Sequence, residues 1–462
     1  MAKNDAKSKG DIPLSVAIGW GFGTLNIAIL FNAKNVLLLK FLTDYIGIAA
    51  IMAGALIGIA KIFDAITDPL MGMLSDRTNT SIGRRRPYLL IGSFMCASSM
   101  IVLFAPPAWA IGSEGYVLFG LLWYSAAYTV FNVPYLAMPA EMTSRYHERS
   151  FLMSFRVAGI SFGQLLAIAA GPIIIAAFGG GMEGHAAVAW VLAGFALAAG
   201  LISFFSTRKA RFTLREEKRY SFGAQLRAVA RNRPFSLLLG AKFCVLTGTA
   251  FYQSAIAFFV ANNLGLGYAA LGTLVAIMTM FGLLSLPLWL RLGRAIGKRQ
   301  TAIWSLALYG IVTASWFFAS ATDPLWMHYV RSALMGATAT GLTLMLQSLL
   351  PDTIALDSAR TGENREGVYA GVYTFAEKIA YAVGTAVTGL FLGLMGYVSS
   401  SGAAATQPES ALMAIALSAS VIPGLFFILS IGFVIAYRLD HAALEKLEAE
   451  SRASAHSATG DA

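Results

Sequence analysis

Charged residues are scarce in this sequence: they make up 13% of its 462 residues, about half the share found in an ordinary soluble domain. Hydrophobic residues make up 57% even before the 45 glycines are counted, and the mean hydropathy is +0.66. A chain with so few charges cannot cover the surface of a water-soluble protein of this length, so we expect lipid to solvate most of it.

Cysteine is nearly absent, and both cysteines, Cys96 and Cys244, lie in apolar runs. This excludes a disulfide framework and a cysteine metal site. The sequence shows no nucleophile–base cluster either, so we expect no enzymatic activity and no cofactor. The first residues, Met1 to Pro13, are polar and lack an apolar core before a small-residue cleavage site, so we expect no cleaved signal peptide.

Long hydrophobic runs dominate what is present. A helix needs about 20 mostly apolar residues to cross the hydrocarbon layer, and twelve runs meet this condition. The predicted spans cover residues 15–40, 47–74, 88–107, 115–140, 151–178, 186–206, 235–261, 267–291, 301–320, 324–350, 368–397 and 411–437.

Lys and Arg alternate between the connections. Odd-numbered connections contain none, whereas every even-numbered one does. Because cytoplasmic loops collect Lys and Arg, this predicts a multi-pass protein of a bacterial-type inner (plasma) membrane with both termini in the cytoplasm. The net charge of +10 is then a topology signal, and we expect no nucleic-acid partner. The basic residues include Arg77, Arg84, Arg85, Arg86, Arg145, Arg149, nine between 208 and 233, Arg294, Lys298, Arg299, Arg360 and Arg365.

A long polar loop divides the spans into two sets of six. A weak repeat supports this division, since SIGRRRPYLLIG after the second span matches AIGKRQTAIWSL after the eighth, which places Gly83 and Gly297 in equivalent positions. Duplicated six-helix halves are typical of secondary transporters. We predict an all-α membrane protein with an N-terminal half (1–206), a cytoplasmic middle loop (207–233), a C-terminal half (234–437) and a cytoplasmic tail (438–462).

The second span carries three charges at membrane depth: Lys61, Asp64 and Asp68. At about 100° per residue they fall within roughly a 60° arc, so they share one face. Two acids and one base leave a net negative charge, which a bound cation or a proton would remove. This predicts cation coupling; a purely structural salt bridge is the alternative.

Other polar residues also lie within the spans, and such residues usually face a cavity or a partner. Lys34 and Arg156 can either line a cavity or extend to the membrane surface, and for Lys242 we expect the surface. A cavity with Lys34, Arg156 and Lys378 would attract an anion or a solute rich in hydroxyls. The other candidates for the substrate site are Asn26, Tyr128, Asn132, Tyr373 and Tyr381, and Thr129 is a candidate for the cation shell.

The loop after the second span combines an acid with several arginines. Their ion pairs are expected to latch one of two conformations, the alternative being a basic loop that serves only topology. The predicted latch consists of Asp76, Arg77, Arg84, Arg85 and Arg86.

At these motifs the chain resembles the glycoside–pentoside–hexuronide:cation symporters, a family of the major facilitator superfamily to which melibiose permease belongs. The likeness extends over essentially the whole length. It rests on GWGFG at 19–23, KFLTDYIG at 40–47, KIFDAITDP at 61–69, SDRTNTSIGRRRPYLLIG at 75–92, YTVFNVPY at 128–135 and GENREGVYAGVYTFAEK at 362–378.

The resemblance implies a major facilitator fold, alternating access and site roles for matching residues. Asp64 and Asp68 would be the cation-site carboxylates, with Thr67 and Thr129 beside them. Lys378 would link the cation and sugar sites, and Arg156 would line the sugar pocket.

The chain departs from melibiose permease where that carrier grips sugar. Two acids are replaced by Ala28 and Asn132, an aromatic platform by Leu136, and Thr67 stands where sodium users have Asn. The pocket is therefore more positive, which suggests an anionic sugar such as a uronide.

We predict a monomeric symporter that imports a sugar, glycoside or uronide with H⁺ or Na⁺. The alternatives are an exporter or lipid-type carrier on the same scaffold, and a membrane enzyme or receptor.

Overall fold

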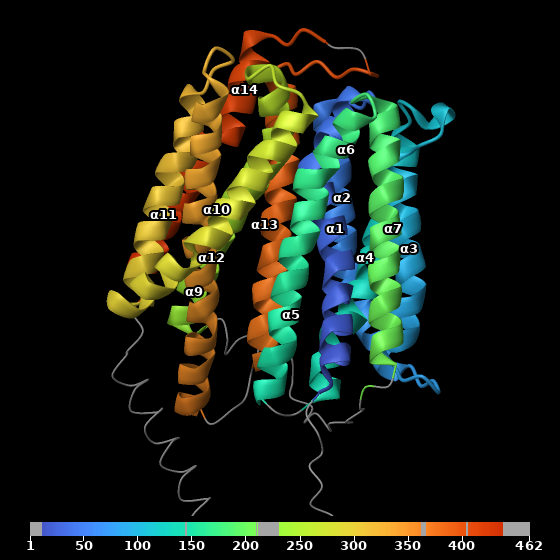
Figure 1. Cartoon of the computed structure of the whole chain (residues 1–462), viewed down its shortest axis with the longest axis vertical. Coiled ribbons are helices and arrows are strands. Elements are labelled where there is room, and N and C mark those ends of the chain that lie inside the picture. The colour runs from blue at the N-terminus through green and yellow to red at the C-terminus, as the bar shows by residue number, and fades with distance from the viewer. Residues whose placement is uncertain are drawn as a thin grey trace, which may run out of the picture.

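The computed structural model describes residues 12–143, 146–208, 210, 231–361, 366–402 and 405–437. Every regular element in this part of the chain is helical (Figure 1). In chain order the elements are α1 (Leu14–Asp44), α2 (Ala50–Arg77), α3 (Arg86–Phe104), η1 (Ala108–Ala110), α4 (Glu114–Met142), α5 (Tyr146–Gln164), η2 (Leu165–Ala170), α6 (Gly171–Ala177), α7 (Met182–Thr207), α9 (Arg233–Phe258), η3 (Phe259–Asn263), α10 (Tyr268–Ala295), α11 (Lys298–Ser315), η4 (Trp316–Phe318), α12 (Leu325–Thr361), α13 (Glu366–Leu394), α14 (Glu409–Ala419) and α15 (Val421–Ala436).

Among the described residues, twelve helical segments are long and apolar enough to cross a membrane. Each corresponds to one predicted span, so the span count is confirmed. Large apolar side chains on the outside of the bundle, such as Ile62, Leu284 and Ile311, are 63%, 66% and 63% exposed. In a soluble protein such a surface would be a liability; here it is the face turned to lipid.

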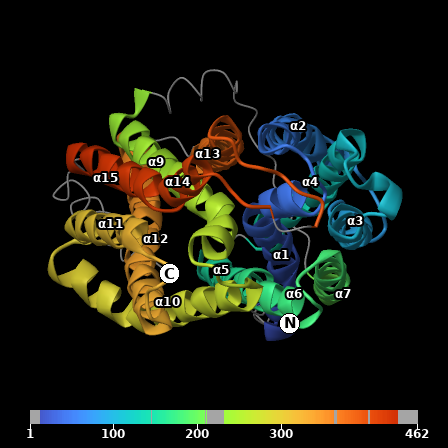
Figure 2. The ribbon, with the colours of Figure 1, turned by 90° about the horizontal axis from the view of Figure 1, so that it is seen from above.

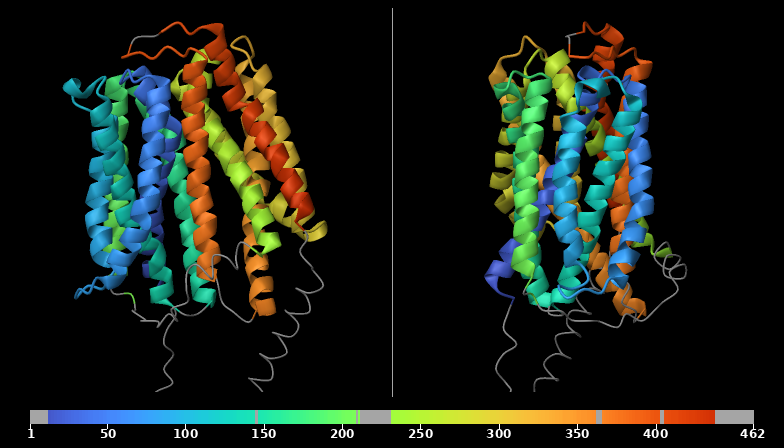
Figure 3. Two further views of the ribbon diagram at one scale, coloured as in Figure 1. Left: turned by 180° about the vertical axis from the view of Figure 1, so that it is seen from behind. Right: turned by 90° about the vertical axis from the view of Figure 1, so that its right-hand side faces the viewer.

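The helices form two lobes side by side, α1–α7 and α9–α15 (Figures 1 and 3). In the N-terminal lobe α1 packs on α5 and α7, and α3 packs on α4 and α7. In the C-terminal lobe α9 packs on α13 and α15, and α10 on α12. The exact domain boundaries stay predictions, because most of the loop 207–233 and the whole tail 438–462 lie outside the described residues.

The lobes meet closely at the end where α1 stops and α2 starts, which is at the top of Figure 1 and is called the upper end here. Seen from above, α13 lies beside α2 and α10 beside α6 (Figure 2). Glycines permit this approach: a Cβ built on Gly389 would stand 2.7 Å from the carbonyl oxygen of Ala50, and one on Gly54 would stand 2.9 Å from that of Ala386. Neither position can hold a larger residue without a shift of backbone.

Several spans are interrupted in ways that hydrophobicity alone does not predict. The fifth and seventh spans contain π-helical turns, Leu165–Ala170 and Phe259–Asn263. The first is followed by Pro172, whose missing N–H weakens the α-helical hydrogen-bond pattern. The last span is divided at Ser420 into α14 and α15, three residues before Pro423.

Candidate functional site

The cluster on α2 lies beside α4 and α13 halfway along the bundle. Lys61 and Asp64 are buried, with 9% and 5% exposure, and Oδ1 of Asp64 has no hydrogen-bond partner among the described residues. Pro69 lies inside α2, directly after Asp68. Because proline has no N–H, the carbonyl oxygen of Ala65 loses its helical donor there. The cluster thus contains unpartnered oxygens of the kind that Na⁺ or a proton could use.

Asp68 is held by two residues from different helices. Oδ1 accepts a 2.8 Å hydrogen bond from the hydroxyl of Thr129 on α4, and Oδ2 forms an ion pair with Nζ of Lys378 on α13. The sequence predicts a net negative cluster, but Lys378 from the other lobe supplies the compensating charge.

Thr67 is placed differently from Thr129. Its hydroxyl donates a 2.9 Å hydrogen bond to the carbonyl oxygen of Phe63, one turn back on its own helix. The hydroxyl is therefore engaged with the backbone of α2, and no hydrogen bond joins it to the carboxylate of Asp64 or Asp68 in the described part of the chain.

A cavity of about 240 Å³ adjoins the cluster. Residues of α1, α2, α4 and α5 surround it on one side, and α13 closes it on the other, so both lobes contribute. The lining residues are Thr24, Ile27, Ala28, Phe31, Asn32, Lys34, Lys61, Asp64, Tyr124, Ser125, Tyr128, Asn132, Leu136, Arg156, Ile160, Thr374, Glu377, Lys378 and Tyr381.

Basic side chains outnumber acidic ones in this cavity. Lys34 and Arg156 both line it, so they face inward rather than the membrane surface. Nζ of Lys34 lies 3.4 Å from the hydroxyl of Ser125, and Lys61 lies 5.8 Å from the ring centroid of Phe31. Lys378 adds a fourth cation against the carboxylates of Asp64 and Glu377. Such a surface favours a solute that carries negative charge.

The structure brings together most of the predicted substrate residues. Tyr128, Asn132 and Tyr381 line the cavity with the basic groups. Asn26 does not: it is fully buried and lies beside Cys96, outside the lining of this cavity. Tyr373 is also absent from the lining; Lys242 lies 3.2 Å from its ring centroid instead.

Glu377 is a cavity residue that the sequence analysis missed. Its Oε2 lies 3.0 Å from Nζ of Lys242, with which it forms an ion pair. Lys242 is buried, so the expectation that it extends to the membrane surface was wrong. The sequence did offer a signal, because Glu377 directly precedes Lys378 in YTFAEK. Adjacent residues of a helix, however, point in directions about 100° apart. Sequence position alone could not show that both side chains reach the same cavity.

The predicted latch forms a network within the N-terminal lobe. Arg85 pairs with Asp76 and Ser75, and Nε of Arg84 and Nε of Arg85 lie 2.6 and 2.9 Å from Oε1 of Glu141. Glu141, at the end of α4, was not predicted.

The remaining two arginines of the predicted latch differ from each other. Arg86 donates a 2.9 Å hydrogen bond to the carbonyl oxygen of Ile82 and a 2.8 Å bond to that of Ala210. Arg77 is exposed and makes no ion pair or hydrogen bond among the described residues. Among the described residues, these contacts lie within the N-terminal lobe, where they join α2, α3 with the connection before it, α4 and Ala210 after α7.

The fold and this cavity define the chain as a twelve-span secondary transporter with a central site. Comparison with known proteins gives the family: the protein-family model described as MFS/sugar transport protein matches residues 19–441 of this chain. The chain belongs to this family of the major facilitator superfamily, which confirms the resemblance to the glycoside–pentoside–hexuronide:cation symporters. It is a multi-pass inner-membrane transporter and not an enzyme.

The similar proteins align with nearly the full length of this chain. The chain is 28% identical to the uncharacterized symporter YnaJ of Bacillus subtilis, over 92% of this chain and 91% of the relative. It is 25% identical to the isoprimeverose transporter of Lactiplantibacillus pentosus, over 94% and 90%. It is 28% identical to the glucuronide carrier protein homolog of Escherichia coli, over 91% and 92%. Among solved structures, the nucleoside transporter NupG matches with a TM-score of 0.62 at 12% identity, over 92% of this chain and 100% of NupG; this last likeness concerns the fold.

Proposed function

We propose that this protein is a symporter that imports a sugar-type solute, specifically an anionic sugar such as a uronide, together with H⁺ or Na⁺. The observation that carries the proposal is the ion pair between Asp68 of one lobe and Lys378 of the other, at the wall of a cavity rich in basic residues. The names of the similar proteins, among them a glucuronide carrier protein homolog and an isoprimeverose transporter, support a sugar as solute.

The cation site consists of Asp64 and Asp68 with Thr129, and with Thr67 after a rotation of its hydroxyl. Without a bound cation, Lys378 neutralises Asp68. A coupling ion competes with this ammonium for the carboxylate. Once displaced, Lys378 turns its charge to the adjoining cavity, where it can bind an anionic group of the solute. Binding of the ion thus prepares the solute site, which is the requirement for coupling.

The solute site consists of Lys34, Asn132, Arg156 and Lys378 with Tyr128 and Tyr381. Arginine and lysine bind carboxylates strongly in a water-poor cavity, while amide and phenol groups match sugar hydroxyls. Asn26 and Tyr373, which are not part of the lining, act through packing in this scheme. The solute would lie between α1, α4 and α5 on one side and α13 on the other, so its binding draws the lobes together.

The lower end of the bundle carries the network of Arg84, Arg85 and Glu141, and we assign it to the cytoplasm with both termini. The Lys and Arg distribution supports this orientation, although the side chains of residues 145, 149, 360 and 365 lie outside the described ones. In this scheme the network fixes the ends of α2, α3 and α4 as one rigid unit while the lobes rock. We assume a monomer, because one chain contains the complete site.

The proposal is tested by solute-induced ion flux in proteoliposomes, with a panel of glycosides and uronides, with and without Na⁺. We expect at least one sugar to drive H⁺ or Na⁺ inward. If no sugar moves an ion, and lysolipid or drug export is found instead, the chain is an exporter or lipid-type carrier on the same scaffold.

The anionic preference needs a separate test. In a competition assay, uptake of a labelled glucuronide should be inhibited at least tenfold more strongly by unlabelled glucuronide than by the matched neutral glucoside. Stronger inhibition by the neutral sugar would reject the anionic substrate while leaving sugar symport intact.

A further inference from the structure

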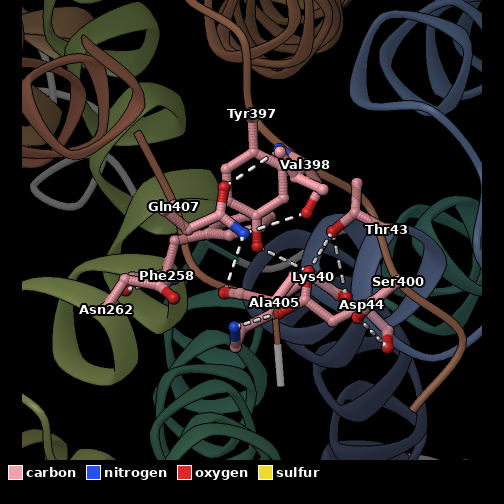
Figure 4. A network of polar contacts seen from close by, with 10 residues as sticks. All are labelled: Lys40, Thr43, Asp44, Phe258, Asn262, Tyr397, Val398, Ser400, Ala405 and Gln407. Carbon is pink, nitrogen blue, oxygen red and sulfur yellow. Dashed lines mark hydrogen bonds and ion pairs between the residues drawn. The ribbon is translucent and has the colours of Figure 1, made fainter. Parts of the chain in front are cut away.

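The last turn of α1 lies against the connection between α13 and α14 at the upper end of the bundle (Figure 4). These two segments belong to different lobes. They adjoin a second cavity of about 660 Å³ that is lined by Lys40, Asp44 and Tyr397 among others. None of these residues belongs to the solute or cation site.

The C-terminal lobe caps the end of α1. The last carbonyl groups of a helix lack helical donors and need partners from elsewhere. Here the N–H of Ser400 donates to the carbonyl oxygen of Thr43 at 2.9 Å, and the N–H of Gly402 donates to that of Asp44 at 2.8 Å. The hydroxyl of Ser400 adds a 3.0 Å bond to the same oxygen of Asp44. A helix of one lobe is therefore terminated by a loop of the other.

The carboxylate of Asp44 is the centre of the contact. Oδ1 accepts hydrogen bonds from the hydroxyl of Tyr397 at 2.6 Å and from that of Thr43 at 2.8 Å, while Oδ2 forms an ion pair with Lys40. A negatively charged side chain is unfavourable at the C-terminal end of a helix, where the helix dipole is negative. The partners of Asp44 offset this unfavourable interaction. Burial, and then the adjacent carboxylate of Asp44, raise the pKa of Tyr397, so the phenol remains a donor.

Lys40 and Tyr397 also contact α9 of the C-terminal lobe. Nζ of Lys40 lies 5.0 Å from the ring centroid of Phe258, and that ring meets Tyr397 edge to face at 5.1 Å. The side chains of Lys40 and Asp44 are only 6% and 17% exposed. The charges are thus largely shielded from water while the lobes are together.

The connection itself is braced within its own lobe. The amide of Gln407 bonds both the N–H and the carbonyl oxygen of Val398 at 2.9 Å (Figure 4). The hydroxyl of Ser410 bonds the carbonyl oxygen of Met395 at 2.8 Å. Because these bonds do not cross between lobes, the connection can leave α1 as a preformed unit, and water can replace the bonds that it loses.

We infer that Asp44 is a gating residue: its carboxylate and carbonyl oxygens hold the α13–α14 connection on α1 and close the upper end of the path, and their release opens it. This rests on the proposed alternating access. The site residues discussed above are not involved. Each turnover must break the four hydrogen bonds from Tyr397, Ser400 and Gly402 and then restore them.

Double electron–electron resonance tests this on the full chain without any solute. Spin labels at Ile111→Cys and Ala321→Cys, both exposed and on upper connections of different lobes, report the separation of the lobes in a background where Cys96 and Cys244 are alanine. We expect one short distance in the reference and a longer one in Asp44→Asn, with about a tenfold rise in the ratio of long to short, as the loss of a charge-assisted bond predicts. Tyr397→Phe should give a smaller rise in the same direction.

Two further variants sharpen the test. Ser410→Ala removes a bond within the C-terminal lobe and should leave the distances unchanged. Lys40→Met combined with Asp44→Asn leaves no unpaired charge and should show a smaller shift than Asp44→Asn alone.

The gate would be overturned if both Asp44→Asn and Tyr397→Phe gave the same distances as the reference protein while thermal unfolding showed that both variants were folded. Should Asp44→Asn not fold, Tyr397→Phe with Ser400→Ala decides by the same criterion. Symport could fail in the flux assay while this gate still held, because the distances require neither ion nor solute.

Discussion

Lys378 has a double position in this molecule, as partner of Asp68 and as part of the cavity wall. A half-buried carboxylate such as that of Asp68 is stabilised by a counter-charge, and a lysine on a helix of the opposite lobe can supply it only while the lobes are close. The ammonium therefore acts as an internal competitor of the coupling ion.

From this competition follows a prediction for Lys378→Met. Removal of the ammonium should strengthen Na⁺ binding, if Na⁺ is the coupling ion, by about tenfold or more, because no protein charge has to be displaced. The same variant should bind an anionic solute more weakly. The measurement is the Na⁺ dependence of thermal stability in detergent, with glucuronide binding as second readout.

The matched control is Lys298→Met, which removes a lysine that pairs with Asp352 at 2.6 Å within the C-terminal lobe. It should leave Na⁺ binding as in the reference. Where the reference protein binds Na⁺, unchanged or weaker Na⁺ binding in Lys378→Met would contradict the competition.

Residue type was enough to predict which residues belong to much of the site, but it did not predict which contacts they make. Ionisable residues in apolar runs are costly, so Lys61, Asp64, Asp68 and Lys378 could be recognised directly. Helical spacing placed the first three on one face. It could not show that Lys378 pairs with Asp68, that Thr67 bonds its own backbone, or that Glu377 reaches the cavity. The pairing of Lys378 and the position of Glu377 depend on how helices far apart in sequence are packed, and the bond of Thr67 depends on which rotamer its side chain adopts on α2.

At the scale of elements, α2 and α13 approach each other closely across the two lobes, because Gly54 and Gly389 leave no side chain between the backbones. A methyl group at Gly389 would lie 2.7 Å from the carbonyl oxygen of Ala50. That distance is shorter than van der Waals contact, and rigid backbone cannot give way cheaply.

Gly389→Ala should therefore destabilise this conformation by about 1–3 kcal/mol, seen as a lower melting temperature in detergent. Gly371→Ala is the matched control on the same helix, since a Cβ there meets nothing within 4 Å. It should be neutral or slightly stabilising, as alanine favours a helix more than glycine does. Equal melting temperatures for the two variants would show that this contact does not hold the lobes.

The helical elements were the most predictable part of the fold. Apolar runs longer than the bilayer thickness leave few alternatives to a spanning helix, and all twelve spans are found. The π-helical turns at 165–170 and 259–263 and the break at Ser420 were not predicted, because they depend on local hydrogen-bond registers that apolar periodicity does not encode.

For the whole molecule, the distribution of Lys and Arg predicts the orientation in the membrane. Asn79→Cys lies in the exposed α2–α3 connection at the lower end, and Ala108→Cys lies at the upper end. A membrane-impermeant maleimide added to intact cells should label Ala108→Cys, and it should label Asn79→Cys only after the membrane is permeabilised. The reverse pattern would place the termini outside and contradict the orientation.

The most direct test of the account is accumulation of a glucuronide in proteoliposomes under an imposed Na⁺ or H⁺ gradient. Asp64→Asn and Asp68→Asn should each lose gradient-driven accumulation by about a hundredfold and still remain folded, because an amide cannot supply the charge that the ion neutralises. Glu114→Gln, an exposed acid at the upper start of α4, is the control and should accumulate solute normally. Undiminished accumulation in both aspartate variants would contradict cation coupling at this site.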